Sequence, residues 1–376
     1  MAAELRVALA GLAALAAAMG IGRFAFTPLL PMMQDDAGVS LAQGGVLAAA
    51  NYFGYLLGAL WAARPAQAST AIRAALSVVA VATLAMGIAE GMAAWIALRF
   101  VAGVASAWAL VHVSSWCLAQ LAGSRRQLNG VLFAGVGSGV TLAGLLVLVL
   151  AQAGASSAQG WLWLGAAAAV LTALGWPVLG VSHAGAARET PARLVWSTDA
   201  VRLVLCYTVY GFAYIIPATF VPAMAKNIVA DPAIFGWAWP LFGATAVVST
   251  LVVAPLQARL GARRIWVIST FVLAAGVAAP LVLDGLGGIV VAAVLVGATF
   301  VVITMAGMQV AREIAGPAAP PLMALMTAGF GLGQVAGPLV VARLDQSGIA
   351  GALAAAALMA AASGLGLGWK EKPCTQ

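Results

Sequence analysis

Long apolar stretches alternate along the chain with short polar separators. Each stretch is close to the roughly 20 apolar residues that a helix needs to cross a bilayer. The stretches lie at about 7–32, 41–63, 71–89, 92–119, 130–152, 160–181, 201–224, 233–257, 265–283, 287–310, 321–342 and 348–369. Polar and turn residues fill the gaps, as at Gln34-Asp35-Asp36. The pattern predicts an all-α polytopic membrane protein with twelve transmembrane helices.

The first stretch also has features of a cleaved signal peptide, because Val7–Met19 is short, apolar and rich in alanine. The apolar character nevertheless continues past Arg23 to Leu30, which gives the length of a full span. We therefore interpret this stretch as the first membrane helix.

The composition fits a membrane location. Apolar residues make up 64% of the chain and charged residues 8%, against about 25% charged residues in a soluble domain. A water-soluble fold has too little interior to bury that much apolar surface. A soluble enzyme, a disordered chain and a secreted disulfide scaffold are thereby excluded. The three cysteines, Cys117, Cys206 and Cys374, show no disulfide pattern.

The net charge of +7, from 18 Lys and Arg against 11 Asp and Glu, is explained by membrane topology. Cytoplasmic loops of membrane proteins carry an excess of Lys and Arg. With the N-terminus inside, the cytoplasmic side holds Arg6, Arg64, Arg73, Arg125, Arg126, Arg188, Arg193, Arg202, Arg259, Arg263, Arg264, Arg312, Lys370 and Lys372. The outer side holds Lys226 and Arg343. This predicts an integral protein of a bacterial-type inner membrane with both termini in the cytoplasm, and nucleic acid is not needed as a partner.

The chain also divides into two similar halves. A polar stretch at 182–200 separates an N-terminal half, 1–181, from a C-terminal half, 201–376, which ends in a short cytoplasmic tail. The motif Ala134–Gly139 recurs as Ala328–Gly333 at an offset of 194 residues. Two parallel six-helix repeats are the architecture of one large class of transporters, whose substrate site lies near the bilayer midplane between the halves.

Three further motifs resemble signatures of the major facilitator superfamily. Leu98–Gly103 resembles its RxxxG motif, Ala258–Arg264 its basic loop, and Gly333–Pro338 its GxxxGP motif. The loop at Gly58–Pro65 departs from the pattern, since it lacks the acidic residue that forms an ion-pair lock in this family. Within the superfamily, Gly20–Pro31 and Ala50–Gly58 resemble the YbfB/YjiJ-type branch.

This resemblance implies a transporter that works by alternating access, and it assigns conformational roles to glycines, to a proline and to the basic loop. These residues are Gly103, Gly135, Gly137, Gly139, Gly333, Gly337, Pro338, Arg259, Gly261 and Arg263. We expect the glycines of span five to let spans five and two approach and slide.

Two charged residues lie at membrane depth, where a charge is costly and therefore indicates function. Arg23 lies in span one and Arg99 in the outer third of span four, and in the resembled fold both spans line the central cavity. No carboxylate lies at their depth in the predicted spans. Because the arginine fork suits carboxylate or phosphate, we predict a small, anionic substrate. The competing interpretation is that either arginine bonds backbone carbonyls or extends toward the membrane surface.

Several uncharged polar residues are candidates to orient that substrate. Tyr207, Tyr210 and Tyr214 share one helix face, and Asn51 and Tyr55 lie four residues apart near mid-membrane. The alternative is that they form hydrogen bonds between helices. Weaker candidates of the same kind are Thr299, Thr304 and Gln334. His112 lies beside Trp108 on the helical projection, which favours a packed histidine over a proton relay.

No metal, nucleotide or nucleophile signature is present, so we expect no cofactor, no metal and no enzymatic activity. The sequence thus predicts a monomeric secondary transporter in a lipid bilayer that moves a small organic anion. An exporter of neutral or lipophilic metabolites or drugs is the alternative. A membrane sensor that does not transport, and a membrane-embedded enzyme, are less favoured, because the loops are short and the spans lack clustered His, Asp, Glu or Cys.

Overall fold

The structure is a computed structural model that describes residues 2–64, 66–121, 127–180, 194–228, 236–341 and 348–368, all of them in helices or in the turns between helices. The helices of the first half are α1 (Ala2–Leu15), the π-helix η1 (Ala16–Ile21), α2 (Phe26–Asp36), α3 (Leu41–Ala62), α4 (Ala68–Met86), α5 (Met92–Gln120), α6 (Gln127–Gln152) and α7 (Ser157–Gly175). Those of the second half are α8 (Thr198–Ile228), α10 (Ala238–Leu260), α11 (Ala262–Val282), α12 (Gly285–Ala315), the 3₁₀ helix η2 (Gly316–Ala318), α13 (Ala319–Val341) and α14 (Gly348–Gly368).

Eleven stretches of the described chain are long and apolar enough to cross a membrane. The first, Ala3–Asp36, joins α1, η1 and α2. The longest, Gly285–Gly337, contains two helices, α12 and α13, which are separated at Gly316 by a glycine with a φ of 51°. Counting these two helices separately gives twelve spans, and the predicted fold class is confirmed.

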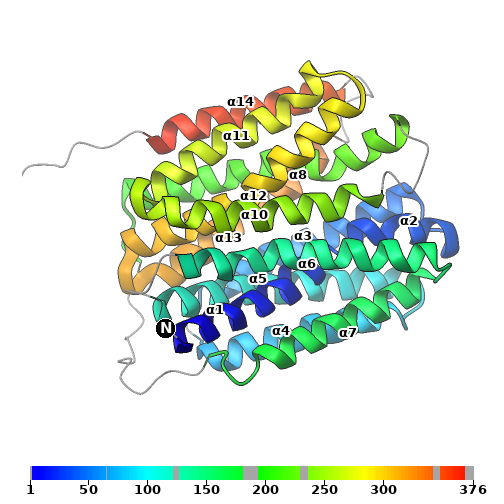
Figure 1. Ribbon diagram of the computed structural model, residues 1–376, viewed down its shortest axis with the longest axis horizontal. Coiled ribbons are helices and arrows are strands. Elements are labelled where there is room, and N and C mark those ends of the chain that lie inside the picture. The colour runs from blue at the N-terminus through cyan, green and yellow to red at the C-terminus, as the bar shows by residue number, and fades with distance from the viewer. Residues whose placement is uncertain are drawn as a thin grey trace, which may run out of the picture.

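The spans form one bundle with its helices roughly side by side, the first half below and the second half above in Figure 1. Helix α1 begins and α14 ends at the same end of the bundle, on the left in Figure 1, and we call this end the terminal face. Across the two halves, α6 packs on α10 and α3 packs on α13. The boundary of the halves stays a prediction, because residues 181–193 lie outside the described part of the chain.

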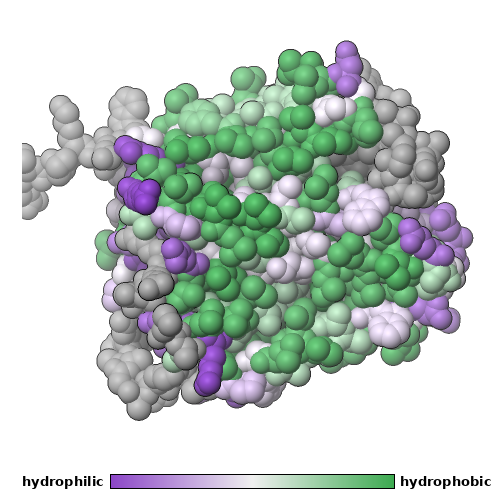
Figure 2. Space-filling model, in the orientation of Figure 1, coloured by the Kyte–Doolittle hydropathy of each residue, from purple (hydrophilic) through white to green (hydrophobic). Residues whose placement is uncertain are grey.

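The exterior of the bundle is apolar in its middle and polar at its ends. Figure 2 shows a green belt between purple groups at the two ends. Large apolar side chains such as Val81, Val149, Leu205 and Val248 are exposed on the exterior of the bundle. Large exposed apolar patches are rare on soluble monomers. An apolar belt of this kind is suited to contact with the hydrocarbon layer of a bilayer.

Not all basic residues of the charge argument can be followed in the structure. Those outside the described residues are Arg125, Arg126, Arg188, Arg193, Arg343, Lys370 and Lys372. The cytoplasmic orientation of the terminal face therefore stays a prediction.

Small residues bring the helices into close contact. A Cβ added to Gly137 of α6 would lie 2.7 Å from the carbonyl oxygen of Gly243 in α10. Gly103 of α5 lies against the carbonyl of Asn51 in α3. Any side chain at these positions would push two helices apart, which explains why glycine occupies them.

The predicted contact between spans five and two is wrong, because the glycines of span five contact spans one and eight instead. Gly135 and Gly139 of α6 lie against the carbonyls of Leu12 and Ala16 in span one, whereas Gly137 on the other face meets α10, which is span eight. A glycine run contacts helices on both of its faces, and the sequence pattern does not say which helices these are.

Candidate functional site

The first span is interrupted in its middle. The π-helix η1 ends at Ile21, a turn covers 22–25, and α2 starts at Phe26. Pro28 has no N–H to donate to a carbonyl in the preceding turn, so it fits the first turn of a new helix better than the interior of a continuous one. The interruption leaves backbone carbonyls at Gly22 and Arg23 that need partners in the bundle interior.

Arg99 provides those partners. Its side chain is buried in α5, and it donates from Nη1 to the Gly22 oxygen (3.2 Å) and from Nη2 to the Arg23 oxygen (3.1 Å). The guanidinium also lies over the Phe26 and Trp161 rings, at 5.0 and 5.9 Å from their centroids. Substrate contact by Arg99 stays a prediction, but both of its terminal nitrogens already hold the interrupted helix. The competing interpretation, an arginine that bonds backbone carbonyls, describes this geometry.

Two other polar residues fix the same region. Asn51 of α3 is fully buried and donates from Nδ2 to the Arg99 carbonyl (3.0 Å), while its Oδ1 has no hydrogen-bond partner among the described residues. Ser106, about two turns after Arg99, donates to the Ala18 oxygen of η1 (2.8 Å). The sequence analysis did not select Ser106. A serine at i+7 from a membrane-embedded arginine shares its helix face, and this spacing was the available signal.

Arg23 points to the interface between the halves. Arg23 is 2% exposed, and its guanidinium lies over the Tyr55 ring, with Cζ 3.6 Å from the ring centroid. Its Nη2 donates to Oε1 of Gln334 in α13, in the other half. Its Nε and Nη1 have no hydrogen-bond partner among the described residues. Arg99 leaves only its Nε without a partner among the described residues, whereas Arg23 leaves both Nε and the terminal Nη1 unused.

Aromatic rings enclose this guanidinium. Tyr214 of α8 stacks on Phe300 of α12 (centroids 5.3 Å apart, 18° between planes) and on Phe330 of α13 (6.1 Å, 27°). Phe330 also packs against Tyr55 at 6.3 Å and lies 5.7 Å from the Arg23 guanidinium. Rings from α3, α8, α12 and α13 thus pack around Arg23 in one cluster, and we call Arg23 with these rings the Arg23 compartment.

The three tyrosines of α8 differ in what their hydroxyl groups do. Tyr210 donates to the Phe300 carbonyl at 2.6 Å, so this hydroxyl joins α8 to α12. Tyr207 packs edge-on against Trp266 and interacts with Thr304. The hydroxyl of Tyr214 has no hydrogen-bond partner among the described residues. Of the predicted trio, Tyr214 has the hydroxyl that is available to a ligand.

The compartment around Arg23 therefore concentrates unused donors. Those found in the described residues are Arg23 Nε and Nη1, Gln334 Nε2, the Tyr55 hydroxyl and the Tyr214 hydroxyl. Burying a donor without a partner costs about 1–3 kcal/mol. The carboxylates of the described chain, Glu4, Asp35, Asp36, Glu90, Asp199, Asp284 and Glu313, all lie at or near helix ends. A buried positive charge with several free donors and no acid at its depth is suited to an anion.

The remaining predicted residues contact groups other than Arg23. Gly333 and Gly337 of α13 approach the Thr208 carbonyl and the Ile215 side chain of α8, and the side chain of Pro338 lies outside the described part. His112 packs edge-on against Trp108 at 5.6 Å. Their conformational or structural roles stay predictions.

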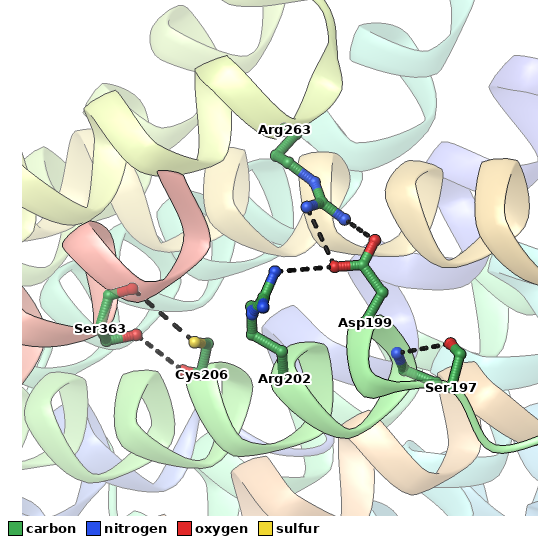
Figure 3. A network of polar contacts seen from close by, with 7 residues as sticks. Ser197, Asp199, Arg202, Cys206, Arg263 and Ser363 are labelled. Carbon is green, nitrogen blue, oxygen red and sulfur yellow. Dashed lines mark hydrogen bonds and ion pairs between the residues drawn. The ribbon is translucent and has the colours of Figure 1, made fainter. Parts of the chain in front are cut away.

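The basic loop between α10 and α11 contributes to a polar network near the terminal face (Figure 3). Arg263 donates to both oxygens of Asp199, which also accepts from Arg202 at 3.1 Å. Gly261, with a φ of 80°, makes the turn before Arg263, and Arg259 is exposed. Asp199 lies in the first turn of α8, so a neighbouring helix supplies the acidic partner of this basic loop.

Comparison with known proteins agrees with this architecture. The family model described as "Uncharacterised MFS-type transporter YbfB" matches residues 15–368. The human organic anion transporter MFSD10 (TETRAN) has a similar structure, with a TM-score of 0.73 and 16% sequence identity over 97% of this chain and 98% of that chain. A search of curated proteins found no match.

These findings define a polytopic membrane transporter of the major facilitator superfamily. The chain belongs to the YbfB-type family of that superfamily. It is an integral membrane protein that acts on a small molecule and not an enzyme, as the sequence predicted.

Proposed function

We propose that this protein is a secondary transporter of a small organic anion, and that Arg23 binds the anionic group. The observation that carries the proposal is the buried Arg23 guanidinium, which has two nitrogens without hydrogen-bond partners and no carboxylate beside it among the described residues. Such a charge is stabilised when an anion accepts its hydrogen bonds. The Tyr55 and Tyr214 hydroxyls would donate to the same ligand or to its polar substituents.

The link between Arg23 and Gln334 supports alternating access. Because the hydrogen bond joins the two halves, a carboxylate that replaces the Gln334 amide oxygen would change a contact between them. Rocking of two six-helix halves, 1–181 and 201–376, about this point would expose the site to one face and then to the other. We propose further that the terminal face is cytoplasmic in a bacterial-type inner membrane and that the unit is a monomer. The name of the human neighbour, an organic anion transporter, agrees with the substrate class.

The walls of the compartment favour an anion with an apolar body. Phe24, Phe300 and Phe330 surround Arg23 and Tyr214. An aryl or alkyl carboxylate would pair its charge with Arg23 and pack its body against these rings. We take 3-phenylpropanoate as the probe.

The test compares Arg23→Gln with Arg73→Gln. Arg73 also donates to a carbonyl, that of Trp176, and lies over the Trp176 ring, but it stands outside the compartment. Thermal unfolding of the purified protein and uptake into proteoliposomes are measured with 3-phenylpropanoate. We expect R23Q to weaken binding by about 30-fold or more, since losing a buried charged partner costs about 2 kcal/mol or more, and R73Q to bind normally. Equal binding by R23Q and the wild type would refute the proposal.

Transport of neutral or lipophilic compounds is the second candidate, and the apolar rings around Arg23 favour it. The neutral amide 3-phenylpropanamide has nearly the same shape as 3-phenylpropanoate. Equal uptake of the two compounds would favour the neutral substrate class, and strong preference for the carboxylate would favour the anion.

A further inference from the structure

A cavity lies near the face opposite the terminal face. It has a volume of about 190 Å³ and is bounded by α2, α6 and α10. Its lining residues are Thr27, Pro28, Pro31, Met32 and Asp35 of span one, Gly144, Val147, Leu148 and Ala151 of α6, and Gly236, Ala238 and Trp239 at the start of span eight. We call it the α2–α6–α10 pocket. For comparison, an engineered cavity of about 150 Å³ accommodates benzene.

A row of aromatic rings separates this pocket from the Arg23 compartment. Trp239 in the pocket stacks on Phe242 (5.3 Å, 9°), and Phe242 stacks on Phe300 (4.9 Å, 21°). Phe300 in turn meets the edge of Phe24, the residue next to Arg23, at 6.0 Å. The pocket and the Arg23 compartment are thus two sites with different walls.

The charge at the pocket is opposite in sign to Arg23, because Asp35 is the one ionisable residue among the described residues that line it. The ring of Trp239, a residue that is 8% exposed, forms part of the wall. Asp35 brings a carboxylate to the rim, where it is exposed and has no partner in the described part of the chain. The neighbouring Asp36 is already engaged, because it accepts from the Ser157 hydroxyl at 2.7 Å and from the Ser157 N–H. A carboxylate at the rim attracts a cation and repels an anion.

We infer that the α2–α6–α10 pocket binds a small organic cation, an ammonium group joined to a single aromatic ring by a short chain. The ammonium would lie at Asp35, and the ring would pack against Trp239 and the apolar side chains of Val147 and Leu148. The volume accommodates one ring and a short chain. This site goes beyond the proposed transport function, because it uses none of the groups around Arg23.

The experiment measures binding of 2-phenylethylammonium to the purified full chain by calorimetry. We expect binding to the wild type and about fivefold weaker binding to D35N, the upper range for an exposed ion pair. Val147→Phe, which fills the pocket, is expected to weaken binding more than tenfold. Asp284→Asn is the matched control, since Asp284 is an exposed acid at the start of α12, outside the pocket, and it should bind as the wild type does.

The two sites can be distinguished with one more variant. R23Q should bind 2-phenylethylammonium normally and lose 3-phenylpropanoate. D35N should bind 3-phenylpropanoate normally and bind 2-phenylethylammonium more weakly. Failure of R23Q to change anion binding would overturn the transport proposal alone. The cation site is overturned if the wild type does not bind 2-phenylethylammonium, or if D35N binds it as tightly as the wild type. Because Asp35 is exposed, D35N is expected to fold normally. It therefore tests the site even if V147F fails to fold.

Discussion

Arg23 and Gln334 are 311 residues apart in the chain, and a hydrogen bond from Nη2 to Oε1 joins them in the buried interior. The arginine comes from the interruption of span one and the glutamine from α13. The Gln334 oxygen thus takes one of the positions that a carboxylate oxygen of a ligand would take. In the proposed function, binding at Arg23 and contact between the halves are coupled through this one hydrogen bond.

Gln334→Glu is expected to provide an internal anion for Arg23. The new carboxylate would pair with the guanidinium and compete with any anionic ligand. We expect affinity for 3-phenylpropanoate to fall about 30-fold or more. Calorimetry measures it, with Gln334→Leu as the control, in which Arg23 loses its neutral partner and the anion binds at least as well as to the wild type. Unchanged affinity in Q334E would place the anion away from Arg23.

Arg99→Gln should mainly reduce stability. The variant leaves the Gly22 and Arg23 carbonyls without their charged donor in the bundle interior, where each lost charged hydrogen bond costs about 1.5–3 kcal/mol. We expect a lower thermal midpoint in detergent than for R73Q. The affinity of the protein that remains folded should fall less than in R23Q. A loss of affinity as large as that in R23Q, with an unchanged midpoint, would instead make Arg99 a ligand contact.

Gly137→Val should block movement between the halves. The valine side chain would collide with the Gly243 carbonyl and with the Ala246 Cβ, 2.7 and 2.9 Å from an added Cβ. We expect little or no proteoliposome uptake. Gly351→Val is the control, since Gly351 in α14 has open space where a Cβ would lie. Normal uptake by G137V would show that α6 and α10 need no close contact during transport.

Asp199→Asn should lower the stability of the protein slightly, by an amount that depends on salt. The side chains of Asp199 and Arg263 are 33% and 27% exposed, so we expect a loss of stability below about 1 kcal/mol. The difference between D199N and the wild type should shrink in 1 M salt, because ions screen the pair. Thermal unfolding of both proteins at low and high salt measures this difference in stability. A large difference that salt leaves unchanged would contradict an exposed, screened ion pair between Asp199 and Arg263.

The sequence alone determined the membrane class and the spans, and it singled out two arginines at membrane depth as candidates. Apolar runs near 20 residues have one stable arrangement, a helix across the bilayer, because hydrocarbon offers no partners for backbone groups. The eleven stretches and the division of Gly285–Gly337 follow from that constraint. The family resemblance rested on local motifs, and the match over 15–368 agrees with it.

The tertiary structure decided what each polar residue does. Arg23 and Arg99 are similar as sequence signals, yet both terminal nitrogens of Arg99 hold the carbonyls of Gly22 and Arg23, while Arg23 keeps one terminal nitrogen, Nη1, without a partner among the described residues. Likewise Tyr210 bonds a backbone carbonyl and Tyr214 does not. A helical pattern fixes the face on which a side chain lies, but its partner belongs to another helix, hundreds of residues away for Arg23 and Gln334. Only the packing of the whole bundle determines which donors are used internally and which remain for a ligand.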